Sequence, residues 1–283
     1  MQFALISDIH GNYKAFEAFL AFIENRKIDG IICLGDYVTD SPYPEKMLSL
    51  LYEMKEKYPC VMVRGNREEY LIDHFYHPED WKISSATGSL YYTYQHIGEK
   101  DIRFFESLPH VRQFKKDGCP STLICHGSPT KIRGNFVHNH ELKDEALQRL
   151  KEQYLFGGHT HHQEVDEIYG KIYVNPGSLG LTIDGVGRQA QFAMLHTKEE
   201  KKGLSWQLEP ISISYDVDSY LHDFTVSGLD EYGMILTKAI KKTLLTGINY
   251  FYKIILEVTG MVNQPLGEIP ESVWQQVAEK FDL

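Results

Sequence analysis

The sequence predicts an α/β fold, because short apolar runs alternate with amphipathic stretches of helical periodicity through its first two-thirds. Two helical stretches separate the first three runs, and this βαβαβ order implies parallel strands with right-handed crossovers. From about residue 164 to 213 the pattern changes to short strands punctuated by Gly and Asn-Pro, and beyond that it is helical. We therefore expect parallel strands, then antiparallel strands, then a helical C-terminal segment.

The expected elements follow one another in a regular order. Pro44 opens the second helix near its first turn, where the fixed φ angle of proline suits a helix. Residues 164–213 are expected to form antiparallel strands that close a second sheet or a flank. The other predicted strands lie at 3–7, 30–35, 60–65, 121–127 and 154–156, and the predicted helices at 13–27, 44–58, 86–107 and 141–153.

The change of pattern divides the chain into a main domain, residues 1–213, and a helical segment, residues 214–283. Apolar side chains recur in this segment at helical spacing, for example Ile254, Ile255 and Val258. We expect the segment to pack on the main domain. A lid over a site and a homodimer contact are the alternatives, because contiguous apolar helices often mediate association.

Composition restricts the possible partners. The 283 residues carry a formal net charge of −10, and the pI is about 5.7. This acidity, without a basic stripe, disfavours nucleic acids and anionic membranes as partners. No run approaches about eighteen apolar residues and no signal peptide is evident, so a cytoplasmic protein that does not enter the membrane is expected. The four cysteines include no Cys-x-x-Cys pair, which favours reduced, buried thiols.

Polar side chains gather directly after five of the predicted strands, most of them next to a glycine. In α/β folds the chemistry is expected at these carboxyl ends. Taken singly, each residue has a structural alternative, such as a turn role for Asn66 after Gly65. As an ordered set they predict a metal site. The set consists of Asp8, His10, Asp36, Asn66, His126, His159 and His161.

The ligand types narrow the choice of metal. Nitrogen and oxygen ligands without a thiolate suit borderline-hard ions such as Mn²⁺, iron or Zn²⁺. Seven ligands are too many for one ion that must also keep water, but they are enough for two ions bridged by one carboxylate. Such a pair can activate water and clamp the oxygens of a phosphoryl group. The sequence therefore predicts a two-metal site suited to chemistry on a phosphoryl group.

The ordered motifs Asp8-x-His10, Gly35-Asp36, Gly65-Asn66, His126 and Gly158-His159-x-His161 resemble the signature of calcineurin-like metallophosphoesterases over about residues 1–200. The stretches HGSP at 126–129 and NPGS at 175–178 resemble the bacterial phosphodiesterase-like branch. The early GDYVTD stretch and the chain length are similar to those of diadenosine tetraphosphate hydrolases and related protein phosphatases. This resemblance implies an α/β (α+β) double β-sheet sandwich flanked by helices.

The resemblance also implies roles for the ligands. One ion would be bound by Asp8, His10, His161 and a bridging Asp36, and the other by Asp36, Asn66, His126 and His159. Manganese and iron are the expected metals, with zinc, nickel or cobalt as alternatives. The implied chemistry is direct attack of a metal-activated hydroxide on phosphorus, with no phospho-enzyme. The residues expected to act in catalysis are Asp36, Asn66, Arg67 and His126.

Arg67 departs from the family pattern, in which a histidine that protonates the leaving group often follows the Gly-Asn pair. Guanidinium is a poor general acid but a strong bidentate partner for oxyanions. We therefore expect cleavage of phosphodiester or phosphoanhydride bonds, as in dinucleoside polyphosphates or small phosphodiesters. The alternatives are a protein serine/threonine phosphatase and a non-catalytic binding module. Arg67 could instead point to solvent or pair with Glu68 or Glu69.

Further contacts to a small phosphate-containing substrate, expected to be a nucleotide, are assigned to three residues. Arg67 and Arg133 are expected to bind phosphates, and a solvated loop charge is the alternative for Arg133. Asn12 is expected either to donate to a phosphate oxygen or to cap the helix that begins at Tyr13. Tyr37 and Tyr43 lie near ligands in sequence and could stack on a nucleobase.

Overall fold

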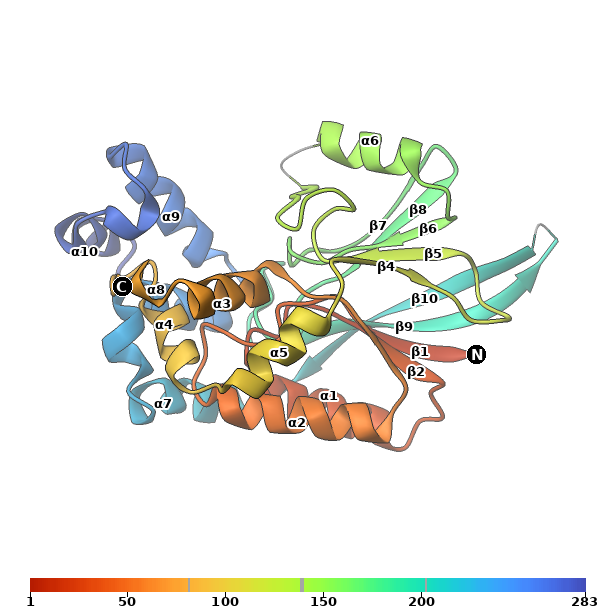
Figure 1. The fold of residues 1–283 in the computed structure, drawn as a ribbon, viewed down its shortest axis with the longest axis horizontal. Helices are drawn as coiled ribbons and strands as arrows, with labels where there is room; N and C mark the ends of the chain where they lie inside the picture. Colours follow the sequence, from red (N-terminus) through yellow and green to blue (C-terminus); the bar gives the residue numbers. More distant parts are fainter. Residues whose placement is uncertain (81, 138–139, 202) are drawn as a thin grey trace.

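The computed structural model describes residues 1–80, 82–137, 140–201 and 203–283, and over these ranges it contains two five-stranded sheets. The two sheets pack face to face, and helices cover their outer faces (Figure 1). Side chains from both sheets, such as Phe3, Val63, Ile124 and Phe156, form the core between them. The predicted pair of sheets flanked by helices is therefore confirmed.

The first sheet has the strand order β10-β9-β1-β2-β3. Its strands β1, β2 and β3 are parallel, as the βαβαβ pattern predicts, and they are connected through α1 and α2. Strand β9 runs antiparallel to β1, and β10 runs antiparallel to β9. The bounds are β1 Gln2–Ile6, α1 Tyr13–Glu24, β2 Gly30–Cys33, α2 Pro44–Lys57, β3 Cys60–Met62, β9 Gln189–Glu200 and β10 Gly203–Ser214.

The second sheet has the order β4-β5-β6-β8-β7. Strands β5, β6 and β8 are parallel, and the edge strands β4 and β7 are antiparallel to their neighbours. The antiparallel strands expected at 164–213 are thus divided: β7 and β8 complete this sheet, whereas the long β9–β10 hairpin extends the first one. The bounds are β4 Val111–Phe114, β5 Thr122–Cys125, β6 Tyr154–Phe156, β7 Gln163–Ile168 and β8 Lys171–Pro176.

The helices that the apolar periodicity predicts are present, with one division, and α3 (Asn66–Tyr76) is a further helix that the sequence analysis did not predict. The predicted helical stretch 86–107 contains two helices, because the chain turns at Gly98, the N-cap of α5. Besides α1 and α2, the described helices are α3 Asn66–Tyr76, α4 Gly88–Gln95, α5 Glu99–Ser107, α6 His140–Arg149, α7 Val217–Val226, α8 Leu229–Thr246, α9 Tyr250–Met261 and α10 Glu271–Lys280, with 3-10 turns at Pro78–Asp80 and Leu266–Glu268. None of these described helices has the length and apolar character needed to cross a bilayer.

The helical C-terminal segment packs on the rest of the chain, on the side opposite the N-terminus (Figure 1). Phe224 of α7 and Ile240 of α8 join the core that lies between the first sheet and its helices. Helices α9 and α10 enclose a smaller core around the fully buried Trp274. The segment is thus attached through α7 and α8, and α9 lies further out.

The homodimer contact stays a prediction, supported by apolar side chains that remain exposed on α9 and just before it. Ile248 is 39% exposed and Leu256 is 52% exposed. Because one charge in an apolar interface is strongly unfavourable, Leu256→Glu should convert a dimer to a monomer without unfolding it. Size-exclusion chromatography with light scattering measures this, and a wild-type chain that stays monomeric at every concentration would exclude the contact.

Candidate active site

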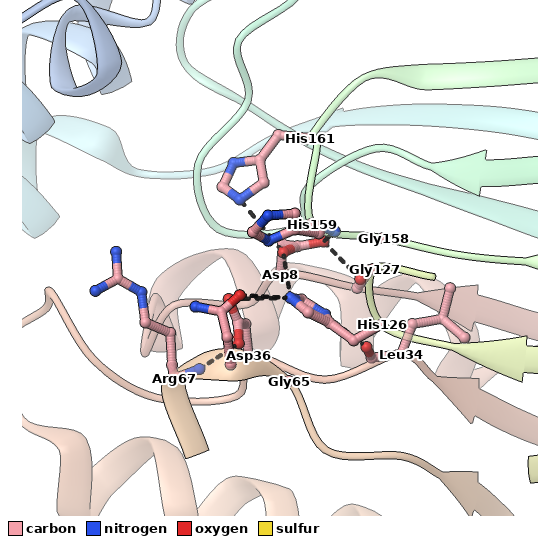
Figure 2. A network of polar contacts seen from close by, with 12 residues as sticks. Asp8, Leu34, Asp36, Gly65, Arg67, His126, Gly127, Gly158, His159 and His161 are labelled. Carbon is pink, nitrogen blue, oxygen red and sulfur yellow. Dashed lines mark hydrogen bonds and ion pairs between the residues drawn. The ribbon is translucent and has the colours of Figure 1, made fainter. Parts of the chain in front are cut away.

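The loops that follow β1, β2, β3, β5 and β6 bring the seven predicted ligands together at one edge of the two sheets. Figure 2 labels Asp8, Asp36, His126, His159 and His161 in this cluster. One atom from each of Asp8, His10 and His161 lies within 4.8 Å of the others. A second group, Asp36, His126 and His159, meets the same limit. These two groups correspond to the two sets that the family resemblance implies.

Asp36 lies between the two groups. Its Oδ2 is 3.3 Å from His126 Nε2 and 3.7 Å from His10 Nε2, so a single carboxylate oxygen faces a ligand of each set. Asn66 belongs to the second group, because its Oδ1 lies 3.2 Å from His126 Nε2. This geometry suits a carboxylate that bridges two ions.

Backbone carbonyls fix which ring nitrogen two of the histidines present to the site. His126 Nδ1 lies 2.8 Å from Leu34 O, and His161 Nδ1 lies 2.8 Å from Leu181 O. Since a carbonyl can only accept, each Nδ1 donates its proton to that carbonyl, which leaves Nε2 as the nitrogen that faces the site and would bind a metal ion. This is the arrangement expected of metal-ligating histidines.

A second observation also indicates a metal site: one buried carboxylate oxygen lacks a hydrogen-bond partner. Asp8 is fully buried, and within the described part of the chain its Oδ1 has no hydrogen bond of acceptable geometry. His10 Nε2 and His161 Nε2 lie 3.1 Å apart beside that oxygen. A buried carboxylate oxygen without a hydrogen-bond donor needs a cation to offset its desolvation.

The pKa values of the site residues also indicate that the site favours positive charge. Burial opposes ionisation of Asp36, but the nearby His126 and His10 together outweigh burial and lower the pKa of Asp36 to about 2. Burial likewise opposes the charge on His126, yet Asp36 and Asp8 raise the pKa of His126 to about 10. Burial and the nearby His126 lower the pKa of His159 to about 4. Two carboxylates are therefore ionised at neutral pH in a buried place that strongly favours positive charge.

The backbone at the site is strained, which is typical of functional loops. Five of the ligands have φ angles in the left-handed region, where residues other than glycine are uncommon. Gly158 allows two of the loops to touch, because a Cβ there would lie 2.0 Å from Ser7 Oγ. The five ligands are Asp8 (53°), His10 (46°), Asp36 (54°), His159 (67°) and His161 (58°).

Glu68 supports the Asp36 loop, a role that the sequence analysis did not assign to it. Its carboxylate is fully buried and accepts from the backbone N–H groups of Asp36 (2.9 Å), Tyr37 (2.8 Å) and Gly65 (2.7 Å). Burial and then Asp36 raise the pKa of Glu68 to about 7, while the backbone donors favour its charged form. The available signal was a glutamate at the third position of a helix, the place of a capping box.

Arg67 pairs with Asp40 rather than with Glu68 or Glu69. Its Nη2 lies 3.0 Å from Asp40 Oδ2, and its side chain is 17% exposed. Its backbone N–H donates to Asp36 Oδ1 at 2.8 Å. In Figure 2 the guanidinium extends to one side of the Asp/His cluster, away from Gly65. Burial opposes its charge, but Asp40 and then Asp36 raise the pKa of Arg67, so it stays protonated.

Asp40 is a further residue that the sequence analysis missed. It is buried, and Ser89 Oγ donates to its Oδ1 at 2.5 Å. Its Oδ2 also lies 3.7 Å from His10 Nδ1. Burial opposes ionisation, but Arg67 and His10 hold the pKa of Asp40 well below its usual range. Asp40 thus connects Arg67 to a predicted metal ligand.

The remaining predicted substrate residues lie outside the cleft. Asn12 caps α1, since its Oδ1 accepts from Ala15 N at 3.0 Å and its Nδ2 donates to Gly180 O and Tyr215 OH. The capping alternative therefore describes Asn12, and its amide donors are occupied. Arg133 donates to Tyr70 OH at 3.1 Å and lines a separate hollow.

The two tyrosines near the ligands in sequence are also turned away from the cleft. Tyr37 is fully buried and donates to Val63 O at 2.6 Å. Tyr43 packs its ring against Tyr13, with 6.2 Å between the ring centroids. Neither ring lines the cleft beside the ligands, so the proposed stacking on a nucleobase would need other aromatic residues.

A cleft of about 240 Å³ lies beside the ligand cluster. His10, Asp36 and Arg67 form part of one wall. The C-terminal helical segment supplies another part, through Ile240 of α8 and three residues at the start of α9: Asn249, Phe251 and Tyr252. The segment therefore reaches the site, which its apolar periodicity alone did not indicate.

Comparison with known proteins assigns the family. The family model of the calcineurin-like phosphoesterase superfamily domain matches residues 1–200. The uncharacterized protein MJ0912 from Methanocaldococcus jannaschii is 25% identical over 244 residues, which cover 81% of this chain and 94% of that protein. This alignment is longer than the predicted main domain, so it extends into the helical segment.

Solved structures show the same fold. A metallophosphoesterase from Sphaerobacter thermophilus superposes with a TM-score of 0.66 at 23% identity, over 88% of this chain and 100% of that one. The hypothetical protein PH1004 from Pyrococcus horikoshii OT3 gives a TM-score of 0.70 at 18% identity, over 87% and 98% of the two chains. Together with the two Asp/His groups, the family match leads to one conclusion: the chain belongs to the calcineurin-like phosphoesterase superfamily and is a metal-dependent phosphoesterase.

Proposed function

We propose that this enzyme hydrolyses phosphodiester or phosphoanhydride bonds of small nucleotides, dinucleoside polyphosphates such as diadenosine tetraphosphate among them. The observation that carries the proposal is Arg67, a permanently charged residue at the wall of the cleft where a proton donor is often found in the family. We propose manganese or iron as the two metals, because the ligands are carboxylate, amide and imidazole groups without a thiolate.

The residues of the cleft suit hydrolysis without a covalent intermediate. When bound by the two ligand groups, metal ions would supply Lewis-acid activation and a water whose pKa is lowered enough to attack phosphorus. No serine or cysteine is among the described residues that line the cleft, and the Oγ1 of Thr160 accepts from Asn175 Nδ2 at 2.8 Å, which disfavours an aliphatic hydroxyl or thiol nucleophile. Asp36 is oriented by the N–H of Arg67, so its other oxygen stays directed at both ligand groups.

Arg67 is suited to binding the phosphates that flank the reacting one. Within the described part of the chain, Asp40 is the only acid within ion-pair distance of its guanidinium. A guanidinium has five N–H donors, so a partner at one edge leaves others for phosphate oxygens. A phosphate or aryl oxide leaves without protonation more easily than an alkoxide, so the missing proton donor favours anhydrides and activated diesters.

Replacing Arg67 with Ala should lower kcat/KM for diadenosine tetraphosphate by about 10- to 100-fold, because a charge-assisted contact to a flanking phosphate is lost. A simple aryl phosphodiester, which has no flanking phosphate, should lose only a few-fold. Arg67→Lys serves as the control that keeps the charge, and it should recover part of the loss. Equal losses on both substrates would contradict the flanking-phosphate role.

A protein serine/threonine phosphatase is the alternative function. It has weaker support, because Arg67 stands where a histidine that protonates the leaving group often follows the Gly-Asn pair. A screen with added Mn²⁺ should compare monoesters, diesters, nucleotides, dinucleoside polyphosphates and a phosphopeptide side by side. The proposal expects the diesters and polyphosphates to be cleaved fastest, and a clear preference for the phosphopeptide would overturn it.

A further inference from the structure

The cleft has an apolar half that phosphate chemistry does not require. Its polar half carries the Asp/His cluster and Arg67. The rest of the lining, here called the apolar half, also contains the polar residues Asn135, Thr160, His162 and Asn249, but most of it is apolar or aromatic and comes from separate parts of the chain: Val137, Leu181, Ile183, Ile240, Phe251 and Tyr252. Neither a metal ion nor a phosphate gains from contact with such a surface. It therefore indicates an organic group attached to the phosphate.

Phe251 joins the two halves. Its ring centroid lies 5.7 Å from Cζ of Arg67, so one aromatic residue borders both the charged region and the apolar region. Phe251 is partly buried, and Tyr252 next to it is 37% exposed. A ring needed only for core packing would be covered by its neighbours, whereas Tyr252 keeps part of its surface open at the cleft.

Backbone contacts connect the wall that carries Phe251 and Tyr252 to the loop that carries Leu181 and Ile183. Helix α8 is capped by Gly247, whose φ of +70° favours glycine and where a Cβ would lie only 2.4 Å from Val186 N. Gly185 N donates to Gly247 O at 2.9 Å. The loop that carries Leu181 and Ile183 is thereby tied to the turn before Phe251. Both apolar walls are thus positioned before a ligand arrives, which lowers the entropy cost of binding.

We propose that the apolar half is a subsite for a planar aromatic group of the substrate, a nucleobase, which stacks on Phe251 while Arg67 contacts the phosphates. This inference rests on the proposed function and specifies the substrate class of the same site. Every nucleobase has a π-face, so stacking selects for a base without selecting its identity. The cleft of about 240 Å³ is smaller than the pockets of about 300–1,000 Å³ that bind drug-sized ligands, so one base with its phosphates fills it.

Equilibrium binding to the Mn²⁺-loaded protein tests the subsite. The two probes are 5′-AMP and ribose 5-phosphate, which share the sugar and the phosphate and differ only in the base. Isothermal titration calorimetry should show that 5′-AMP binds about tenfold more tightly or better, the gain expected from stacking one base. Equal affinities in the wild-type protein would overturn the proposal.

Variants of Phe251 identify the residue responsible. Phe251→Leu removes the ring and keeps an apolar side chain for packing, so the fold should survive. It should weaken 5′-AMP about tenfold and leave ribose 5-phosphate unchanged. Phe251→Trp should restore the preference. Tyr169→Leu, which removes an exposed ring between β7 and β8, is the matched control and should change neither affinity.

Two outcomes separate failure of the inference from failure of the proposed function. If Phe251→Leu weakens both probes equally, Phe251 has only a structural role and the subsite is refuted. If the wild-type protein binds 5′-AMP preferentially but cleaves no diester or anhydride, the subsite stands and the proposed reaction fails.

Discussion

Replacing Asp36 with Asn is expected to lower kcat/KM by about three orders of magnitude or more for every phosphoester substrate. Asp36 Oδ2 lies within 3.7 Å of a histidine from each ligand group, so the loss of its charge affects both metal sites at once. An amide of the same shape keeps the packing but is a poor ligand for two cations. Steady-state assays with added Mn²⁺, together with metal analysis of the purified variant, measure the effect.

The contrast with Asp40→Asn makes this prediction specific. Asp40 is also buried and acidic, but it belongs to neither ligand group and instead lies next to His10 and Arg67. Asp40→Asn is therefore expected to lower metal affinity or activity by about 10- to 100-fold, the typical cost of losing a supporting partner of a ligand. Asp36→Asn should also leave the protein with less than its full metal content. Activity retained by Asp36→Asn at high Mn²⁺ would refute the bridging role.

The clustering of the candidate metal ligands could be predicted from the sequence because each follows an apolar run that is typical of a buried strand. In parallel sheets the carboxyl ends of neighbouring strands meet at one edge, so residues such as Asp8, Asp36 and Asn66 are brought together by topology alone. The alternation of strands and helices was sufficient to place them. No knowledge of side-chain packing was required.

The residues that surround the ligands could not be predicted, because their roles arise from contacts between distant segments. Asp40 pairs with Ser89 of α4, and Arg67 meets Phe251 of α9. Periodicity shows which face of a helix is apolar but not which neighbour covers it. The sequence also does not show that β7 and β8 join one sheet whereas β9 and β10 join the other. That division depends on which strand edge is free in the folded chain.

Glu68 combines a local cap of α3 with contacts to the distant Asp36 loop, and Glu68→Gln is expected to lower the free energy of unfolding by about 1–3 kcal/mol. Both carboxylate oxygens of Glu68 accept from buried backbone N–H groups, two at Oε2 and one at Oε1. A glutamine replaces one of these oxygens with an NH₂ group, so at least one backbone N–H faces another donor in either orientation of the amide. Chemical denaturation of the metal-free protein measures the change.

The consequence should extend to the metal site, because two of the three N–H groups belong to Asp36 and Tyr37. A loosened loop moves Asp36 away from both ligand groups, and metal affinity should fall about 10- to 100-fold, as it does when a ligand loses its supporting hydrogen bonds. Glu69→Gln is the matched control on the next residue of α3. Glu69 is more exposed and pairs with Arg64 at 3.3 Å, so its loss should change stability by less than about 0.5 kcal/mol. If Glu68→Gln is as stable as Glu69→Gln, the first turn of α3 does not hold the Asp36 loop in place.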